Sequence, residues 1–330
     1  MIQLKRNPHN PIIKPRPGIW WEKRGVFNPG VIFDGEVFHL LYRAVGADNV
    51  SRFGYAYSVD GVNFLGFRDT PAFAPFEGDP NERLGCEDPR LTCLNNTYYI
   101  AYTAVSLRGP EAAQDYPLAA GVSCNVRVGL ASTKNFSHFD RLGMVIGNVN
   151  TKDAALFPAK IDDHYLMLHR VEPDIWIAYS KDLSHWHDHK IILRPRSDSW
   201  DSKRIGGGAP PLATPYGWLL FYHGVDGQGI YHLGIVVLDL KDPARVLYRS
   251  VSPVFSPAQS YEKRGNVNNV VFTCGVVERA DHFWIYYGAA DLCIGLATVA
   301  KEELLEEVAS GLKHEELPQR LGAELSPLTK

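Results

Sequence analysis

Apolar and polar positions along the chain repeat in units of about 60 residues. In each unit a small or polar residue opens an apolar run, a turn follows, and a second, aromatic-rich run ends on another polar residue. Asn28, for example, opens a run that leads through a turn to Tyr42 and Arg43. A second hairpin then completes each unit. The opening residues are Asn28, Asp88, Asp153, Gly208 and Asn269, at spacings of 60, 65, 55 and 61.

Four strands repeated at this interval are typical of a propeller blade with long loops. Five such units fill residues 25–300, so the pattern predicts an all-β chain that forms a single five-bladed β-propeller. We expect one domain over residues 1–330. Residues 1–24 are expected to be an arm that closes the ring or covers an opening. Residues 301–330 are expected to be a helical tail, in which the spacing of Leu304, Leu305, Val308 and Leu312 predicts a short helix over 301–312.

Composition narrows the function classes. The formal net charge of the 330 residues is −3, which gives no strong field for nucleic acid or an anionic membrane. The sequence has no apolar run near the roughly 18 residues of a membrane helix, and no signal-peptide pattern at its start. The 5 cysteines lack paired metal spacing, so we expect reduced thiols and a cytoplasmic protein.

Residues 84–92 carry the candidate chemistry, because the adjacent carboxylates Glu87 and Asp88 precede Pro89 and Arg90 there. Proline restricts the residue before it, so we expect Asp88 to enter a strand from an extended or turn conformation. Arg90 would then point to the same side as Asp88. A carboxyl group at the mouth of a strand suits proton transfer to a sugar oxygen. The alternative is a turn-forming Asp-Pro whose carboxylate caps local amides.

Equivalent positions of a propeller converge at the mouth of its central channel. The polar residues at or near these positions are Asn28, Arg43, Asp88, Lys152, Asp153, Arg170, Arg204, His223 and Asp291. Clustered charges cost desolvation unless they are paired, so we interpret this set as a site. The alternative is a set of ion pairs that pin the blades together.

At this point the chain resembles glycoside hydrolase family 130, the five-bladed β-mannoside phosphorylases and their hydrolytic relatives. The resemblance covers essentially the whole chain. It rests on residues 87–90, 152–160 and 168–170, on Trp200 and the run Arg204-Ile-Gly-Gly-Gly-Ala-Pro-Pro, and on residues 217–225 and 286–291.

The resemblance implies a role for each matching residue. Asp88 would be the general acid, which protonates the glycosidic oxygen through the sugar 3-hydroxyl. Inorganic phosphate, as co-substrate, would be held by Lys152, Arg170, Arg204 and His223. The mannosyl unit and its surroundings would be held by Asn28, Arg43 and Asp291, and we also assign Arg90 and Asp153 to substrate binding. The expected product is α-D-mannose 1-phosphate, with no cofactor and no metal.

The chemistry of the residues agrees with this reading. Arginine forks bind phosphate oxygens in pairs, and several cations with a histidine suit an anionic nucleophile better than water. A bound phosphate can replace the base-activated water of an inverting glycosidase. Lys152 stands where some family members carry Arg.

Three functional alternatives stay open. Glu172, close to Arg170 in sequence, raises the possibility of hydrolysis by a β-mannosidase, although it can also be a loop acid paired with Arg170 or solvated. Another five-bladed glycosidase is a further enzyme alternative. A non-catalytic glycan-binding propeller is the third. The linkage, the acceptor sugar and the oligomeric state are open, and the helix over 301–312 could serve a homo-oligomer.

Several weaker features have structural explanations. The tract over residues 185–189 is rich in histidine but matches no zinc spacing, and the repeat places it in an outer strand or turn. The long segment 106–125 is expected to be a lid or binding loop. Some aromatic side chains could stack on sugars, and these are Trp20, Trp21, Tyr116 and Trp200.

Overall fold

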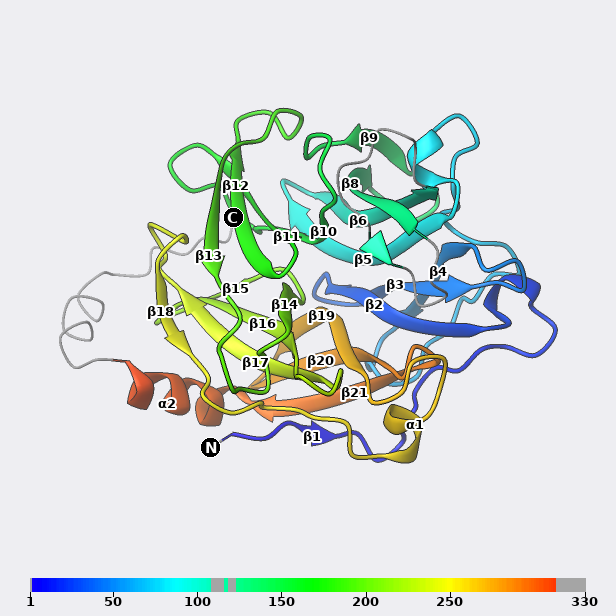
Figure 1. Ribbon diagram of the computed structural model, residues 1–330. Helices are drawn as coiled ribbons and strands as arrows, with labels where there is room; N and C mark the ends of the chain where they lie inside the picture. Colours follow the sequence, from blue (N-terminus) through cyan, green and yellow to red (C-terminus); the bar gives the residue numbers. More distant parts are fainter. Residues whose placement is uncertain (1, 108–115, 118–122, 313–330) are drawn as a thin grey trace.

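The computed structural model describes residues 2–107, 116–117 and 123–312. Its strands form five antiparallel groups arranged around a common centre (Figure 1). The first contains β2 (Gly25–Phe33), β3 (Phe38–Val45) and β4 (Ser51–Ser58). The second contains β5 (Gly85–Leu94), β6 (Thr97–Leu107), β7 (Tyr116–Pro117), β8 (Ser123–Thr133) and β9 (Asp140–Met144). A single parallel bridge between Ser51 and Gly85 joins these two groups into one hydrogen-bonded sheet.

The other three groups are separate sheets. The third contains β10 (Lys152–Leu156), β11 (Tyr165–Val171), β12 (Asp174–Ser180) and β13 (His187–Leu193). The fourth contains β14 (Arg204–Gly207), β15 (Leu212–Thr214), β16 (Gly217–Val225), β17 (Tyr231–Leu238) and β18 (Val246–Arg249). The fifth contains β19 (Val271–Arg279), β20 (His282–Ala289), β21 (Cys293–Ala300) and the N-terminal β1 (Lys5–Arg6).

The prediction of an all-β chain is confirmed. The helical elements of the described residues are short: α1 (Ser260–Lys263), α2 (Lys301–Gly311) and the 3-10 turns η1 (Trp20–Glu22) and η2 (Pro80–Glu82). Among the described residues there is also no helix with the length and apolarity that crossing a membrane requires. The 5 cysteines, all of which are described, form no disulfide.

The apolar core lies between neighbouring groups, and every group shares one apolar cluster with the next. Leu41 and Ile100 belong to the cluster between the first and second groups. Val26 and Tyr286 belong to a cluster that joins the first group to the fifth. Equivalent clusters join the second group to the third, the third to the fourth and the fourth to the fifth. The alternating strand pattern therefore buries both faces of most sheets.

A β-bulge recurs where the innermost strands begin. Asn28, Asp88, Asp153 and Asn269 all have a positive φ between 47° and 59°, a region that Asn and Asp tolerate better than other non-glycine residues. In β2, β5 and β10 the strand register shifts at this residue. Asp88 was expected to be either extended or in a turn before Pro89. It is not extended, and a left-handed bulge places its side chain.

Four of the five groups carry a buried cluster that we call the latch. It consists of a carboxylate from the segment before the innermost strand, a tyrosine from the second strand and an arginine. Glu22 accepts a hydrogen bond from Tyr42 Oη at 2.6 Å and pairs with Arg16 at 2.9 Å. The other latches are Glu82–Tyr102–Arg141, Asp201–Tyr222–Arg249 and Glu262–Tyr287–Arg6. Each tyrosine faces a glycine on the third strand, which leaves room for its ring.

The third group lacks this latch. His169 occupies the tyrosine position, and Trp176 stands where the other groups have glycine. The imidazole contacts Thr151 Oγ1 at 2.9 Å and His189 Nδ1 at 3.0 Å. Burial, with a contribution from nearby His189, lowers the pKa of His169 to about 3, so this side chain is neutral. It is an imidazole packed near the end of β11.

Both ends of the described chain pack on the fifth group. β1 pairs with β21 through Lys5↔Thr298 and Arg6↔Ala297, so the N-terminal segment supplies the outermost strand. The apolar face of α2 is buried on its own chain, and Leu304 and Val308 join Ile2 and Leu4 in one cluster. The helix therefore packs on the strands, which is one of the two positions expected for it.

Candidate active site

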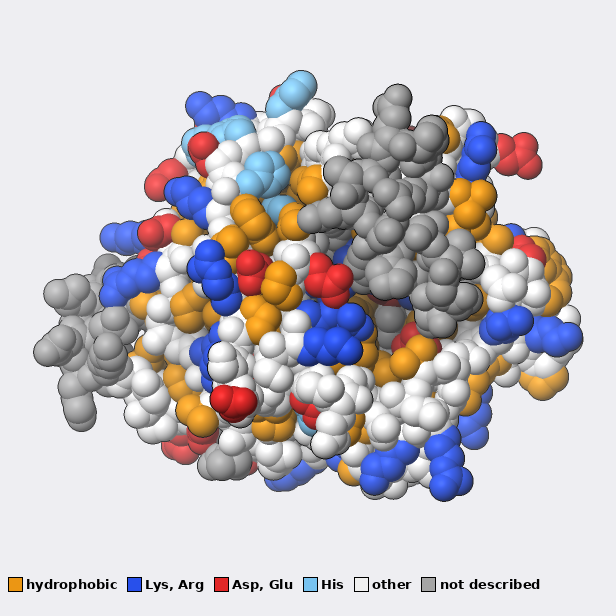
Figure 2. Space-filling model, viewed as in Figure 1, with side chains coloured by type: hydrophobic (Ala, Val, Ile, Leu, Met, Phe, Trp, Pro, Cys, Tyr) orange, Lys and Arg blue, Asp and Glu red, His pale blue; other side chains and the backbone are white. Residues whose placement is uncertain are grey.

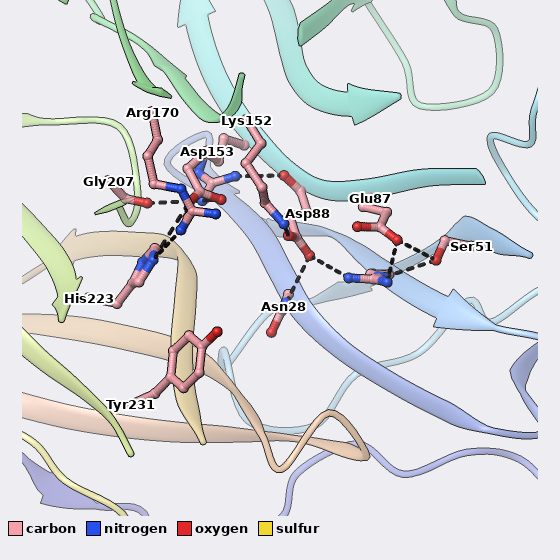
Figure 3. A network of polar contacts seen from close by, with 12 residues as sticks. Asn28, Ser51, Glu87, Asp88, Lys152, Asp153, Arg170, Gly207, His223 and Tyr231 are labelled. Atoms are coloured by element: carbon pink, nitrogen blue, oxygen red, sulfur yellow. Dashed lines mark hydrogen bonds and ion pairs between the residues drawn. The ribbon is translucent and has the colours of Figure 1, made fainter. Parts of the chain in front are cut away.

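Asp88 belongs to a network of polar contacts (Figure 3), and its side chain is only 2% exposed. Its Oδ1 accepts a hydrogen bond from Asn28 Nδ2 at 2.8 Å and pairs with Arg43 Nη1 at 3.2 Å. Lys152 Nζ lies 3.5 Å from its Oδ2. Burial opposes ionisation, but the charges of Arg43, Lys152 and Arg90 outweigh it and hold the pKa of Asp88 well below its ordinary value. Asp88 is therefore an ionised carboxylate here.

A second cluster lies directly beside the first, on β10, β11 and β16. Arg170 Nη1 pairs with Asp153 Oδ2 at 2.9 Å and lies 3.3 Å from His223 Nε2. All three side chains are at most 3% exposed. Burial lowers the pKa of His223 to about 3 despite the opposing effect of Asp153. Because the guanidinium can only donate, the neutral imidazole accepts through Nε2.

Arg90 contacts residues of both clusters and is 1% exposed. It donates to the carbonyl oxygens of Asp88, Gly207 and Gly208 at 3.0, 2.9 and 2.6 Å, and its Nη2 lies 3.4 Å from Asp153 Oδ1. These carbonyl oxygens belong to β5 and to the end of β14, so Arg90 holds the backbones of these two strands together. Arg90 was expected to point to the same side of the strand as Asp88. The β-bulge at Asp88 breaks the regular alternation, and the two side chains have different partners.

On the other side of Asp88, Arg43 ties the first and second strand groups together. Its Nη2 pairs with Glu87 Oε1 at 2.5 Å, and its Nε donates to Ser51 Oγ at 3.0 Å. Asp291 follows β20 and is partly exposed. Burial and the charges of Asp88 and Glu87 raise the pKa of Asp291 to about 6, although Arg43 lowers it.

Arg204 lies at the start of β14, and its side chain is 28% exposed. Its guanidinium pairs with Glu172 Oε1 at 3.2 Å and donates to Tyr231 Oη. Glu172 thus pairs with Arg204 and not with Arg170, the partner suggested from sequence proximity. Tyr231, which the sequence did not single out, lies over His223 with a ring separation of 6.0 Å.

Gly206 explains part of the glycine run. A Cβ atom at this position would lie 2.5 Å from Asp153 Oδ2 and 2.4 Å from His223 Cε1. Only glycine therefore lets β14 approach the buried histidine and carboxylate this closely.

Charged side chains of both signs also gather near the middle of the face shown in Figure 2. The histidine tract lies elsewhere, with β13 as the outermost strand of its group, as predicted. In the described part of the chain, no three His, Cys, Asp or Glu side chains are grouped so that they could hold a metal.

Two of the aromatic candidates for sugar stacking occupy other positions. Trp21 is 1% exposed and packs on Tyr42, so the suggestion that it stacks on sugar is wrong. Trp200 packs against Tyr222. Trp20 is 55% exposed, and the side chain of Tyr116 and most of the segment 106–125 lie outside the described residues.

Comparisons with known proteins identify the class. The model of glycoside hydrolase family 130, described as beta-1,4-mannooligosaccharide phosphorylase, matches residues 3–310. A 1,2-beta-oligomannan phosphorylase of Thermoanaerobacter sp. (strain X514) is 41% identical over 311 residues, covering 92% of this chain and 99% of the relative. A beta-1,2-mannobiose phosphorylase of the same organism is 42% identical over 320 residues, with the same coverage.

A solved structure agrees with these matches. The beta-1,2-mannobiose phosphorylase from Listeria innocua, in complex with beta-1,2-mannobiose, has a TM-score of 0.80 at 28% identity and covers 94% of this chain and 100% of that one. The chain therefore belongs to glycoside hydrolase family 130, as its sequence motifs indicated.

Proposed function

We propose that this protein is an inverting β-mannoside phosphorylase, which cleaves β-mannosides with inorganic phosphate and releases α-D-mannose 1-phosphate. The observation that carries the proposal is the buried carboxylate of Asp88, with Lys152 3.5 Å away and the Arg170–His223 cluster beside it. A carboxyl group in the position of the acid, with several cations close to it, suits an anionic nucleophile. The activities in the names of the two Thermoanaerobacter relatives support the same reaction.

The fold proposed for this reaction is one five-bladed β-propeller that spans the chain. The five strand groups, the apolar clusters between neighbouring groups and the contact between the first and fifth groups support it. In this arrangement β2, β5, β10, β14 and β19 line the centre, and the charged residues lie at one end of it.

The roles follow from position. Asp88 gives a proton to the glycosidic oxygen through the sugar 3-hydroxyl, while phosphate attacks the anomeric carbon from the opposite face. Phosphate is bound by Lys152, Arg170, Arg204 and His223. The mannosyl unit is bound by Asn28, Arg43 and Asp291. Arg90 and Asp153 are fully buried and bonded to each other, so we assign them to positioning and no longer to substrate contact. Phosphate is the co-substrate, and the reaction needs no cofactor.

The β-1,2 linkage is the first to test, because it appears in the names of both Thermoanaerobacter relatives. Purified protein is incubated with β-1,2- or β-1,4-mannobiose, with and without inorganic phosphate, and the products are separated. We expect mannose 1-phosphate only when phosphate is present.

Hydrolysis is the second candidate, because Glu172 lies beside Arg204 at the edge of the cluster. Release of free mannose at the same rate without phosphate would make the protein a β-mannosidase, with Glu172 as the first candidate for the base. If neither sugar reacts but both bind, the protein is a glycan-binding member of the family.

Replacement of the acid gives a further prediction. We expect Asp88→Asn to reduce turnover by about 10²- to 10⁴-fold, because a general acid typically contributes that much. The melting temperature serves as the folding control, and Asp162→Asn, at an exposed turn, should leave turnover unchanged. Near-normal phosphorolysis by Asp88→Asn would remove Asp88 from this role.

A further inference from the structure

Three of the side chains assigned to phosphate are already paired with a carboxylate, and the pairs are Lys152–Asp88, Arg170–Asp153 and Arg204–Glu172, at 3.5, 2.9 and 3.2 Å. The carboxylates differ in burial. Those of the first two pairs are at most 2% exposed, whereas the side chain of Glu172 is 37% exposed. A buried carboxylate that leaves its partner becomes an uncompensated buried charge, but Glu172 can turn into water at little cost. Of these three, Glu172 is therefore the carboxylate that an incoming anion can displace.

The backbone holds Glu172 beside Arg204. Glu172 lies in the turn between β11 and β12. The carbonyl oxygen of the next residue, Pro173, accepts a hydrogen bond from the N–H of Ile205 at 3.0 Å. This bond ties the turn to the start of β14, one residue after Arg204. The ion pair thus forms between two segments that the backbone already fixes next to each other.

Arg204 also borders the cluster around His223. A Cβ atom on Gly206, two residues further along β14, would lie 2.4 Å from His223 Cε1 and 2.5 Å from Asp153 Oδ2. Because side chains at positions i and i+2 leave a strand on the same side, Arg204 emerges on this side too. Arg204 donates to Tyr231 Oη, and the Tyr231 ring lies 6.0 Å from the His223 ring. An anion bound beside His223 is therefore within reach of Arg204.

Phosphate and Glu172 compete for the same guanidinium group. Glu172 Oε1 lies 3.2 Å from Arg204 Nη1, and an anion oxygen hydrogen-bonded to this nitrogen lies about 3 Å from it, so the two oxygens are at most about 6 Å apart. Even at the dielectric constant of bulk water, about 80, a dianion this close to a carboxylate is disfavoured by roughly five- to tenfold. Glu172 avoids this repulsion only by giving up its ion pair with Arg204.

We propose that Glu172 pairs with Arg204 when no phosphate is bound and is displaced by phosphate, so that this carboxylate sets the affinity of the enzyme for phosphate. The inference deepens the proposed function and rests on it. The same competition applies to mannose 1-phosphate, because its phosphate group takes the same place. The carboxylate lowers the affinity for both anions and thereby favours release of the product.

Kinetics in both directions of the reaction test the proposal. Glu172→Gln keeps the shape of the side chain but removes its charge. We expect it to lower the KM for phosphate, and the KM for mannose 1-phosphate in synthesis, by about three- to tenfold, each measured while the co-substrate is saturating. The KM for mannobiose should change much less. Calorimetric titration of inorganic phosphate into the protein without sugar should show the same gain in affinity.

Two comparisons show whether the effect is specific. Asp162→Asn also removes one negative charge, at an exposed turn, and should match the wild type in every measurement. In protein that carries Arg204→Gln the contested guanidinium is absent, so Glu172→Gln should raise the affinity for phosphate much less there than in the wild-type background. Melting temperatures of all the variants serve as the folding control.

The outcomes are distinct. An unchanged or higher KM for phosphate in Glu172→Gln overturns the inference, and so does an equal effect in the Arg204→Gln background. Equal changes in the KM for phosphate and for mannobiose overturn it as well. If the wild type forms mannose 1-phosphate while one of these results is obtained, the proposed function stands without the inference. If the wild type cleaves mannobiose without phosphate and Glu172→Gln abolishes that cleavage, both fail, and Glu172 is the base of a hydrolase.

Discussion

Residues at the centre owe their positions to unusual backbone geometry as much as to their side chains. Asp88 has a φ of 54°, and Asn28 and Asp153 adopt the same conformation at the equivalent bulges. The bulge re-aims each side chain, so that three neighbouring strands present a carboxylate or amide at one place. Strain of this kind is often kept at functional sites.

The phosphate side of the site leads to a test on kinetic constants. We expect Arg204→Glu, and less severely Arg170→Ala, to raise the KM for phosphate by roughly 10- to 100-fold, because a charge-assisted hydrogen bond contributes about 1.5–3 kcal/mol. The KM for mannobiose should change much less. Initial rates are measured against each substrate while the other is saturating. Equal changes in both constants would contradict phosphate binding by these side chains.

Asp291 gives a prediction on pH and stability. Its pKa of about 6 in the folded protein exceeds the ordinary value of 3.8 for an aspartate, so the folded state binds the proton more tightly than the unfolded state. Stability from this group is therefore complete below pH 3.8 and is lost as the pH rises towards 6. Asp291→Asn should gain free energy of unfolding relative to the wild type across that interval, and the difference should be constant above it. Denaturant titrations at pH 4, 5, 6 and 7 check this. A difference that does not vary with pH would contradict it.

Most of the residues that form the site could be predicted from the sequence, but their hydrogen-bond and ion-pair partners could not. The repeat brought Asp88, Lys152, Arg170 and His223 to one place, because equivalent positions converge. The backbone carbonyls that bind Arg90, and the pairing of Glu172 with Arg204, depend on strands that are distant in sequence. Local rules also left Asp88 either extended or in a turn, because they describe what proline permits and not what a bulge imposes.

At the scale of elements, the latches hold each innermost strand to the second strand of its group. The residue after the latch tyrosine or its histidine counterpart faces the site in three groups, as Arg43, Arg170 and His223. The latches of the first and fourth groups therefore each position a residue of the site, Arg43 and His223, next to the latch tyrosine. The sequence does carry a signal for the latches that could have been used. A proline is followed five to seven residues later by an acidic residue, as in Pro15–Glu22 and Pro257–Glu262.

Removing one latch hydroxyl should be costly. Tyr102→Phe removes one of the hydrogen bonds to the buried Glu82, which keeps those from the Phe76 N–H and from Arg141, and we expect a loss of about 1–3 kcal/mol in the free energy of unfolding. Tyr57→Phe, at a position that is 38% exposed, is the matched control and should lie within about 0.5 kcal/mol of the wild type. Denaturant unfolding measures both, and equal stabilities would show that the latch contributes little.

At the scale of the whole molecule, the N-terminal segment packs against α2 and pairs with β21. Ile2 and Leu4 are buried under α2, and β1 completes the fifth group. The sequence predicted an arm before residue 25 that closes or covers the molecule, but the pairing with β21 depends on contacts across almost the entire chain.

Leu4→Ala tests how much the contacts between the N-terminal segment and α2 contribute to the stability of the fold. The side chain is 5% exposed, and we expect the loss of a buried leucine to cost about 2–5 kcal/mol. Leu65→Ala, at a position that is 60% exposed, is the control and should have little effect. Melting curves of the two variants provide the comparison. A Leu4 variant as stable as the control would mean that the N-terminal strand adds little to the fold.

The pairing of β1 with β21 also constrains the order in which parts of the chain can fold during translation. Lys5 leaves the ribosome well before its partner Thr298, which lies 293 residues further along the chain (298 − 5). At about 5–20 residues per second, roughly 15–60 s separate the two. During that time the first strand has no partner of its own, although the groups between can already pair locally. Lys5 and Arg6 thus reach their native contacts later than the strand groups between them and β21, and the sheet of the fifth group is completed only after β21 has been made.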